Sequence, residues 1–363
     1  MKLLIIGFTK IKYMPYIHFY LEHIDCSQNE VHIFFWNRSG EDDDVVLKQN
    51  VILHEFKMNQ EDDCSKIKKI PAFLFFKREI KKLFSSHNFE FIIVLQTLPA
   101  ILLYILLKKR YKERYIYDYR DFTFENIPIY KKMVADLTLC SSATFVSSNA
   151  FREYLPQSKK IYTSHNILLD SLKHRSVRDR YDRNVTPIRI RYWGLIRYAR
   201  TNIELIKQIA NDYRFEMHFH GRYQAEALKI KEFCGNNQIE NVFFHKEYLP
   251  NERYYFIAET DILQNAQDFD LITCNAVSNK FYDGAIFYIP QLCTKGSYMG
   301  ELVEQYGLGL AVDVKTENIA ERLYDYYNHL EWDSFRTHCD NYIKIVLKEF
   351  HEGVNLVRQL TNS

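Results

Sequence analysis

Short runs of β-branched and aromatic residues alternate along the chain with longer segments whose apolar residues are spaced as in helices. In the first half this pattern predicts strands at residues 3–6, 31–36, 51–53, 91–95, 115–117 and 143–146. Helical spacing lies between several of these runs, as at residues 76–84 and 101–107. Because parallel strands need a crossover connection, the alternation predicts a parallel sheet covered by helices.

A charged, turn-rich stretch at residues 173–187 has almost no apolar content, and we interpret it as a linker or domain-edge loop. Alternation then resumes, which predicts a second α/β domain, doubly wound like the first. The expected elements are strands at 188–193, 215–219, 242–244, 262–264, 291–293 and 310–312, a helix at 202–211, and one long amphipathic helix or two at 337–360. We expect domains at 1–170 and 188–340, a linker at 171–187, and a C-terminal helix at 341–363, with packing onto the first domain as one option.

This architecture indicates where ligands bind. In open parallel sheets they bind outside the carboxyl ends of the strands, where helix N-termini point their amides. Two such domains facing each other form an interdomain cleft. We therefore look for function in the loops that follow strands.

Composition narrows the function classes. A length of 363 residues favours two domains at about 150 residues each, and a net charge of +2 excludes a global positive field for nucleic acid. Glycine and proline number only 11 and 8, and no G-x-G-x-x-G or Walker A pattern occurs, so a glycine-rich phosphate cradle is not expected. The seven scattered cysteines show no C-x-x-C spacing, as is typical of reduced thiols in a cytoplasmic protein. The first residues have too short an apolar run for a secretory signal, and residues 91–107 are too short to span a bilayer.

The loop after the strand at 188–193 is the first candidate site. Gly194 permits a tight exit from the strand, and Arg197 and Arg200 precede a helix that begins near Thr201. Guanidinium groups beside a helix N-terminus attract a diphosphate, because both supply positive potential and donors. The alternative is that these are solvated surface arginines.

The second candidate is the short helix expected before Pro290. Ser278 or Asn279 is its expected cap, and Lys280 and Asp283 share one face. A lysine in the first turn suits phosphate, while a carboxylate one turn deeper suits ribose hydroxyls. An ordinary intrahelical ion pair between Lys280 and Asp283 is the alternative.

These two segments carry a resemblance. Gly194-x-Ile196-Arg197-x-x-Arg200 resembles the G-x-I-R-x-x-K loop of nucleotide-sugar-dependent glycosyltransferases with the two-domain GT-B fold. Ser278-Asn279-Lys280-Phe281-Tyr282-Asp283, followed by Pro290, is similar to their S-N-K-x-x-E…P segment, in the style of glycosyltransferase family 4 and capsular or exopolysaccharide enzymes. The resemblance covers most of residues 188–315 and, more loosely, the whole chain.

The resemblance implies a donor site in the second domain and an acceptor site in the first. Arg197 and Arg200, with Lys280 and the amides of Ser278 and Asn279, would then hold the diphosphate. Asp283 would bind the ribose, and Gly221 would line the nucleotide pocket. Retaining relatives carry a glutamate where this chain has Asn275, so retention of configuration is not supported. No metal or other cofactor is expected, because the acidic run at 41–44 lies too early to be an Asp-x-Asp pair.

On the acceptor side, Asp121 follows a strand and is the candidate general base, with His18 as a rival. Asp118, Arg120 and Asp121 together are equally interpreted as a structural salt-bridge cluster. Gly7, at the end of the first strand, would supply backbone near the reacting sugar.

Basic residues interleave with aromatic ones at 66–84 and 107–114, which indicates peripheral contact with an anionic membrane or, alternatively, a buried helix face with solvated lysines. The function implied is transfer of a sugar from a UDP-sugar, or a GDP-sugar, to a glycan or lipid-linked acceptor in surface polysaccharide synthesis. The expected location is the cytoplasm, with the inner face of the cell membrane as an option, and no nucleic-acid partner. The rival hypothesis is a non-catalytic glycan- or nucleotide-binding paralogue of an active transferase, and a sugar-nucleotide epimerase is a third.

Overall fold

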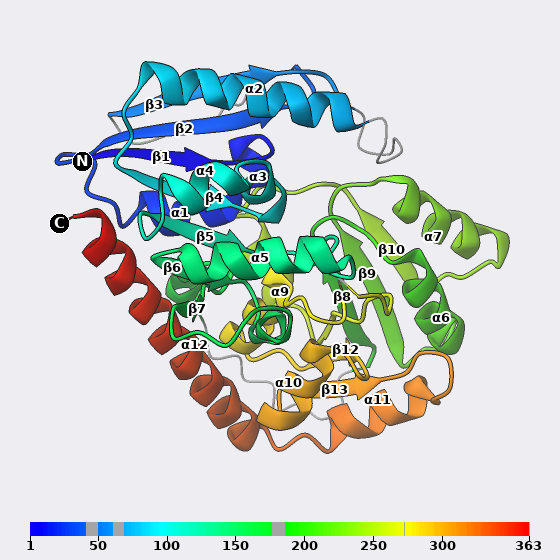
Figure 1. Cartoon of the computed structure of the whole chain (residues 1–363). Coiled ribbons are helices and arrows are strands. Elements are labelled where there is room, and N and C mark those ends of the chain that lie inside the picture. The colour runs from blue at the N-terminus through cyan, green and yellow to red at the C-terminus, as the bar shows by residue number, and fades with distance from the viewer. Residues whose placement is uncertain (41–49, 61–68, 176–185, 272, 363) are drawn as a thin grey trace. The chain divides into compact units, whose positions relative to one another are not determined.

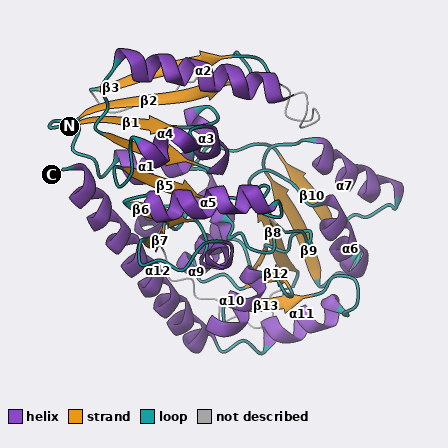
Figure 2. Cartoon of the chain, in the orientation of Figure 1, coloured by secondary structure: helices purple, strands orange, loops and turns teal. Residues whose placement is uncertain are grey.

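The computed structural model describes residues 1–40, 50–60, 69–175, 186–271 and 273–362. The chain divides into two compact units, which are Met1–His165 together with Lys348–Ser363, and Asn166–Leu347. The predicted α/β class, with two parallel sheets, is confirmed (Figures 1 and 2). No helix within the described ranges combines the length and the apolar character needed to cross a membrane.

The first unit contains a seven-stranded parallel sheet in the order β3-β2-β1-β4-β5-β6-β7. Its central strands are buried on both faces and therefore read as nearly continuous apolar runs. The strands are β1 Lys2–Ile6, β2 Glu30–Asn37, β3 Val51–Lys57, β4 Phe91–Leu95, β5 Tyr115–Tyr119, β6 Ala143–Val146 and β7 Ile161–Thr163. The α-helices are α1 His18–Leu21, α2 Ile70–Ser86, α3 Thr97–Leu102, α4 Tyr104–Lys109 and α5 Pro128–Cys140, with short 3₁₀ helices at Ile11–Tyr13, Pro15–Ile17 and Asn149–Tyr154.

The second unit contains a six-stranded parallel sheet in the order β10-β9-β8-β11-β12-β13. The order reverses between β8 and β11, so this pair forms the switch point where the strand ends leave a crevice. The strands are β8 Ile188–Trp193, β9 Phe215–His220, β10 Val242–His245, β11 Ile262–Gln264, β12 Gln291–Thr294 and β13 Gly309–Val312. The helices are α6 Ala199–Ile209, α7 Ala225–Asn236, α8 Arg253–Ala258, α9 Asn279–Ile286, α10 Tyr298–Tyr306, α11 Ile319–Asn328 and the first part of α12 Trp332–Thr361, with a 3₁₀ helix at Leu169–His174.

The strands predicted from the apolar runs are all present, whereas three helical features differ from the expectation. The segment predicted as one helix at 101–107 is two helices, α3 and α4, which meet at buried Leu103. The C-terminal helix is single and begins at Trp332 rather than at residue 341. Of the stretch expected as a linker, residues 171–174 continue the 3₁₀ helix, and residues 176–185 lie outside the described residues.

The last turns of α12 belong to the core of the first unit. Phe350 is buried and its ring centroid lies 5.2 Å from that of Phe19. A β-carbon at Gly353 would lie 3.0 Å from atoms of both Phe19 and Phe145, so the helix packs closely there. Burial of these rings against β6 explains why Lys348–Ser363 clusters with residues 1–165.

Candidate functional site

Two glycines touch where β8 and β9 end. The Gly194 N–H donates to the His220 carbonyl at 3.0 Å, and both Gly194 and Gly221 have positive φ, at 103° and 143°. A β-carbon at Gly221 would lie 1.8 Å from the Gly194 carbonyl oxygen. No side chain fits at Gly221, so the two loops run against each other at the carboxyl edge of the sheet.

Side-chain hydrogen bonds to backbone carbonyls hold the loop after β8 in place. The Asn202 amide donates to the carbonyls of Arg197 and Tyr198, at 2.8 and 3.0 Å. Tyr198, the residue before α6, adopts a left-handed conformation with φ 62°. The Tyr192 hydroxyl donates to the Leu195 carbonyl at 2.9 Å. These bonds turn the loop sharply and leave the Arg197 side chain exposed.

Helix α9 is fixed by a polar network at its base. The Ser278 hydroxyl donates to Asn265 Oδ1 at 2.8 Å, and Asn265 Nδ2 donates to Gln291 Oε1 at 3.2 Å. Ser278 occupies the N-cap position of α9, as expected. Its hydroxyl, however, makes no capping hydrogen bond to the helix. Its N–H lies 3.5 Å from the Met299 sulfur, and Asn279 is exposed. A β-carbon at Gly284 would lie 2.4 Å from the Gln291 side chain, so glycine permits close packing of α9 on β12.

Lys280 carries a buried ammonium group for which the structure gives no hydrogen-bond partner among the described residues. Its Nζ lies 3.2 Å from the centroid of the Tyr192 ring, which is a cation–π contact. Burial lowers the pKa of Lys280 to about 7, and the Arg197 charge lowers it further, against opposing effects of Cys293 and Asp283. Lys280 and Arg197 therefore share one electrostatic environment at the switch point.

Asp283 is buried and does not form the ion pair with Lys280 that was the alternative interpretation of this helix. Its Oδ2 accepts instead from Arg253 Nη1 and Trp193 Nε1, both at 3.2 Å. Burial raises the pKa of Asp283 to about 6, although Arg253 opposes the shift. The Arg253 guanidinium also donates to the Ser171 hydroxyl. Arg253 and Trp193 were not among the sequence candidates.

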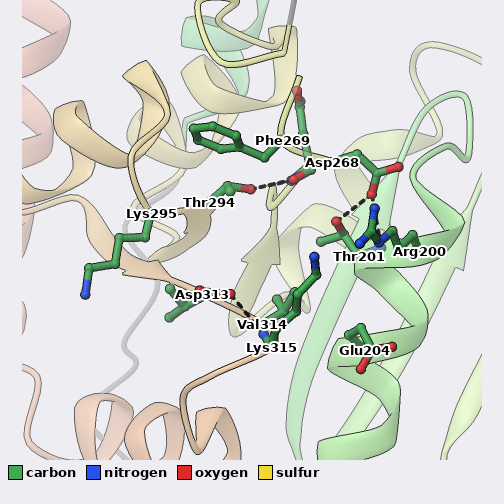
Figure 3. A pocket seen from close by; sticks show the side chains of 12 residues that line it. Arg200, Thr201, Glu204, Asp268, Phe269, Thr294, Lys295, Asp313, Val314 and Lys315 are labelled. Carbon is green, nitrogen blue, oxygen red and sulfur yellow. Dashed lines mark hydrogen bonds between the residues drawn. The ribbon is translucent and has the colours of Figure 1, made fainter. Parts of the chain in front are cut away.

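Arg200 lies apart from this cluster. It lines a pocket of about 360 Å³ whose other residues include Asp268, Lys295 and Lys315, and which contains neither Lys280 nor Arg197 (Figure 3). Thr201 donates to Asp268 through both its N–H, at 3.1 Å, and its hydroxyl, at 2.6 Å. The structure thus brings Arg197 and Lys280 together but turns Arg200 toward a different hollow.

In the first unit, the acidic segment after β5 separates into two parts. Asp118 and Arg120 are a buried ion pair at 2.9 Å, and the Tyr20 hydroxyl donates to Asp118 at 2.8 Å. Asp121 is exposed, and desolvation by its surroundings raises the pKa of its carboxyl even so, with Arg120 opposing. The salt-bridge interpretation therefore holds for Asp118 and Arg120, while Asp121 stays accessible.

Gly7 directly follows β1, at the carboxyl edge of the same sheet, and His18 lies further along the chain in α1. Gly7 is buried at the end of β1, where its N–H donates to the Phe34 carbonyl at 2.8 Å. His18 is exposed at the first position of α1.

Solved structures similar to this chain share one architecture. Sucrose-phosphate synthase from Thermosynechococcus elongatus has a TM-score of 0.64 and 12% identity, over 99% of this chain and 95% of that one. HepE of Anabaena in complex with UDP and glucose has a TM-score of 0.65 and 13% identity, over 99% and 97%. The lipopolysaccharide outer core galactosyltransferase WaaB has a TM-score of 0.61 and 13% identity, over 98% and 99%. This chain has the GT-B fold.

The GT-B likeness is one of structure. No protein-family profile matches the sequence, and no curated protein matches it. In this fold the switch point of the second unit, with Gly194, Gly221 and Lys280, lies at the carboxyl edge where parallel sheets bind ligands.

The close contact between Gly194 and Gly221 predicts that a side chain at Gly221 lowers the free energy of unfolding. Gly221→Ala places a β-carbon against a backbone oxygen, so we expect a loss of about 2–4 kcal/mol in unfolding free energy or a displaced β8 loop. Gly235→Ala, in α7 with nothing within 4 Å, is the matched control and is expected to be neutral or slightly stabilising. Urea titration of both variants distinguishes them, and equal midpoints would contradict the prediction.

Proposed function

We propose that the chain is a glycosyltransferase that moves a sugar from a nucleotide-diphosphate donor, preferably a UDP-sugar, to a glycan or lipid-linked acceptor. The observation that carries the proposal is the buried Lys280 ammonium beside Arg197 at the switch point of the second sheet. An ammonium group without a hydrogen-bond acceptor costs free energy, and a bound diphosphate supplies one. The similar HepE structure holds UDP and glucose.

In this proposal Arg197 and Lys280 stabilise the departing diphosphate. The bond between the anomeric carbon and the diphosphate oxygen breaks, and positive charge placed before the reaction lowers the barrier to that charge separation. We propose that these two side chains take the role that a divalent cation has in other transferases. The amides at the N-terminus of α9, from Asn279 onward, add positive potential.

The buried Asp283 has a positioning role in the proposal. Its Oδ2 already accepts from Trp193 and Arg253, so it fixes both side chains against α9. A ribose contact by Asp283, which the resemblance implies, remains a prediction. Arg200 lies in the neighbouring pocket, and we assign it a smaller contribution to donor binding.

For the acceptor, we propose that Asp121 is the general base. It accepts the proton of the acceptor hydroxyl while that oxygen bonds to the anomeric carbon. Its exposure and its place after β5 keep it accessible to a substrate, and the direction of its pKa shift favours proton uptake.

The lowered pKa of Lys280 predicts how the affinity for the donor nucleotide changes with pH. At pH 8 the free protein carries a mostly neutral Lys280, whereas diphosphate binding favours the ammonium form, so binding of UDP takes up a proton. Affinity therefore falls as pH rises through about 7, by up to about tenfold per pH unit. Calorimetry at pH 8 in two buffers of different ionisation enthalpy measures this uptake.

The matched variants for that measurement are Lys280→Met and Lys295→Met. Lys280→Met is expected to abolish the proton uptake and weaken UDP binding, while Lys295→Met, an exposed lysine of the neighbouring pocket, retains the uptake. Proton uptake that persists in Lys280→Met would remove Lys280 from the donor site.

A sugar-transfer assay tests the proposal that the chain is a glycosyltransferase. With a panel of UDP- and GDP-sugars and glycan or lipid-linked acceptors, nucleotide release by Asp121→Asn is expected to fall about 10²–10⁴-fold, with UDP affinity unchanged. His18→Ala is expected to retain activity. The reverse pattern would assign the base to His18, and nucleotide binding without any turnover in the native chain would favour the non-catalytic paralogue.

We also propose that the exposed side of α2 binds an anionic membrane. This contact would bring the protein within reach of a lipid-linked acceptor in that membrane. The exposed side of α2 includes Leu74 and Phe75, at 60% and 47% exposure, beside Arg78, Lys81 and Lys82. Apolar side chains flanked by cations are typical of helices that lie on anionic bilayers. Residues 66–68 of the predicted basic segment lie outside the described residues, as does the acidic run at 41–44.

Vesicle sedimentation tests this surface. Phe75→Glu is expected to weaken binding to phosphatidylserine-containing vesicles about tenfold, because it removes apolar area and adds repulsion. Leu228→Glu, at a position on α7 that is 58% exposed, is the control and is expected to bind like the native chain. Equal binding to neutral and anionic vesicles would contradict the proposal.

A further inference from the structure

The pocket that Arg200 lines is separate from the proposed donor site, because it contains neither Arg197 nor Lys280. Its walls come from the first turns of α6 and from the loops that follow β11, β12 and β13 (Figure 3). It therefore lies at the carboxyl edge of the second sheet, where parallel sheets bind ligands. Its volume of about 360 Å³ is at the lower end of the range for small-molecule sites, about 300–1,000 Å³, and suits a ligand the size of a monosaccharide.

Hydrogen bonds between its own segments fix the shape of this pocket. The Gln267 N–H donates to the Thr294 hydroxyl at 2.8 Å, and that hydroxyl donates to the Gln267 carbonyl at 2.7 Å. On the other side, the Gln208 amide of α6 donates to the Val314 carbonyl at 2.8 Å. The loop after β11 is thus joined to β12, and α6 is joined to the loop after β13. The pocket is formed before a ligand binds.

The side chain of Gln267 supplies the first sign of a ligand. Gln267 is only 7% exposed and lines the pocket, yet its side-chain amide has no hydrogen-bond partner within the described part of the chain. A buried amide without a partner costs free energy. An amide offers two N–H donors and one carbonyl acceptor, and this combination matches hydroxyl groups, which both donate and accept. The pocket therefore lacks a partner that bears hydroxyl groups.

Two cations supply the second sign. Arg200 of α6 and Lys315 of the loop after β13 are exposed, and the structure gives neither side chain an ion pair among the described residues. Lys295 differs, because it pairs with Glu317 at 3.4 Å, and Figure 3 shows its side chain directed away from the other two. A guanidinium and an ammonium group from two walls of one pocket attract a phosphate group.

Carboxylates in the same pocket indicate what accompanies the phosphate. Glu204, Asp268 and Asp313 line the pocket with the cations. A small inorganic anion would meet their negative charge, which weakens its binding. Carboxylate oxygens accept hydrogen bonds, however, and the hydroxyl groups of a sugar donate them. The set of side chains thus fits a molecule with one anionic group and several hydroxyl groups.

We propose that this pocket binds a phosphorylated monosaccharide. The phosphate lies between Arg200 and Lys315, and the sugar hydroxyl groups bind the Gln267 amide and the neighbouring carboxylates. Phe269 also lines the pocket and is 66% exposed, so its ring offers an apolar surface to the C–H groups of the sugar. The proposal concerns a second ligand and holds whether or not the chain transfers sugars.

Calorimetric titration of the full chain tests the proposal with glucose 6-phosphate, glucose 1-phosphate and mannose 6-phosphate as probes. At least one of them is expected to bind at a single saturable site, about tenfold or more tighter than either glucose or inorganic phosphate, because the pocket has partners for both parts of the ligand. Inorganic phosphate bound as tightly as the hexose phosphates would make this an ordinary anion site. Glucuronate bound as tightly would make it a site for sugar carboxylates. Either result would overturn the proposal.

Two variants test the residues. Lys315→Met removes an exposed cation, so the fold is expected to be retained and hexose phosphate binding to weaken about tenfold or more. Gln267→Met keeps the size of the side chain and removes its amide, and it is expected to weaken binding about tenfold. Native affinity in Lys315→Met would contradict the assignment of the phosphate position.

Lys280→Met is the matched control, because it removes a cation from the proposed donor site and leaves this pocket intact. It is expected to bind the hexose phosphates like the native chain. A loss equal to that of Lys315→Met would place these ligands at the donor site, and the absence of saturable binding by all three would leave the pocket without its ligand; both results would overturn the proposal. Neither result depends on UDP binding, so the donor-site proposal is tested separately.

Discussion

The packing of the second unit depends on the hydrogen-bond partners of one buried carboxylate, that of Asp283. Asp283 accepts from Trp193 of β8 and from Arg253 of α8, and Arg253 in turn donates to Ser171. A buried charge is tolerated only with partners, and removal of one partner is far more damaging than the pair is stabilising. Three segments distant in sequence are thus fixed against α9, and the floor of the candidate site is rigid before any ligand arrives.

The pairing of Asp283 with Arg253 also determines the state of Lys280. Had the carboxylate paired with the lysine one turn away, the ammonium would be neutralised within its own helix. Instead Lys280 rests over the Tyr192 ring, and its pKa falls to about 7. The helix therefore presents a cation whose preferred partner comes from outside the chain, which is the property expected of a phosphate-binding group.

The sequence predicts the periodic parts of this molecule well. Strand 188–193 and the short helix before Pro290 follow from apolar spacing, Gly194 and the proline, which are local signals. The Arg253–Asp283 pair and the Gly194–Gly221 contact depend on which elements become neighbours in space, so no local spacing reveals them. The break at Leu103 likewise reflects packing in a buried position. Arg197 and Lys280 were found because they follow strand ends, whereas the direction of the Arg200 side chain, one helical turn further on, had no such signal.

The course of α12 has a consequence for biosynthesis. The first unit contains Phe350 and Gly353, which pack on Phe19 and Phe145, yet all of Asn166–Leu347 is translated between them. While the nascent chain grows, the aromatic cluster around Phe19 is open to water, and the second unit is the first to have its whole sequence outside the ribosome. Completion of the earlier-synthesised half thus waits until residues 348–362 have left the ribosome, and a chain stalled or cut before them would display that apolar surface to chaperones.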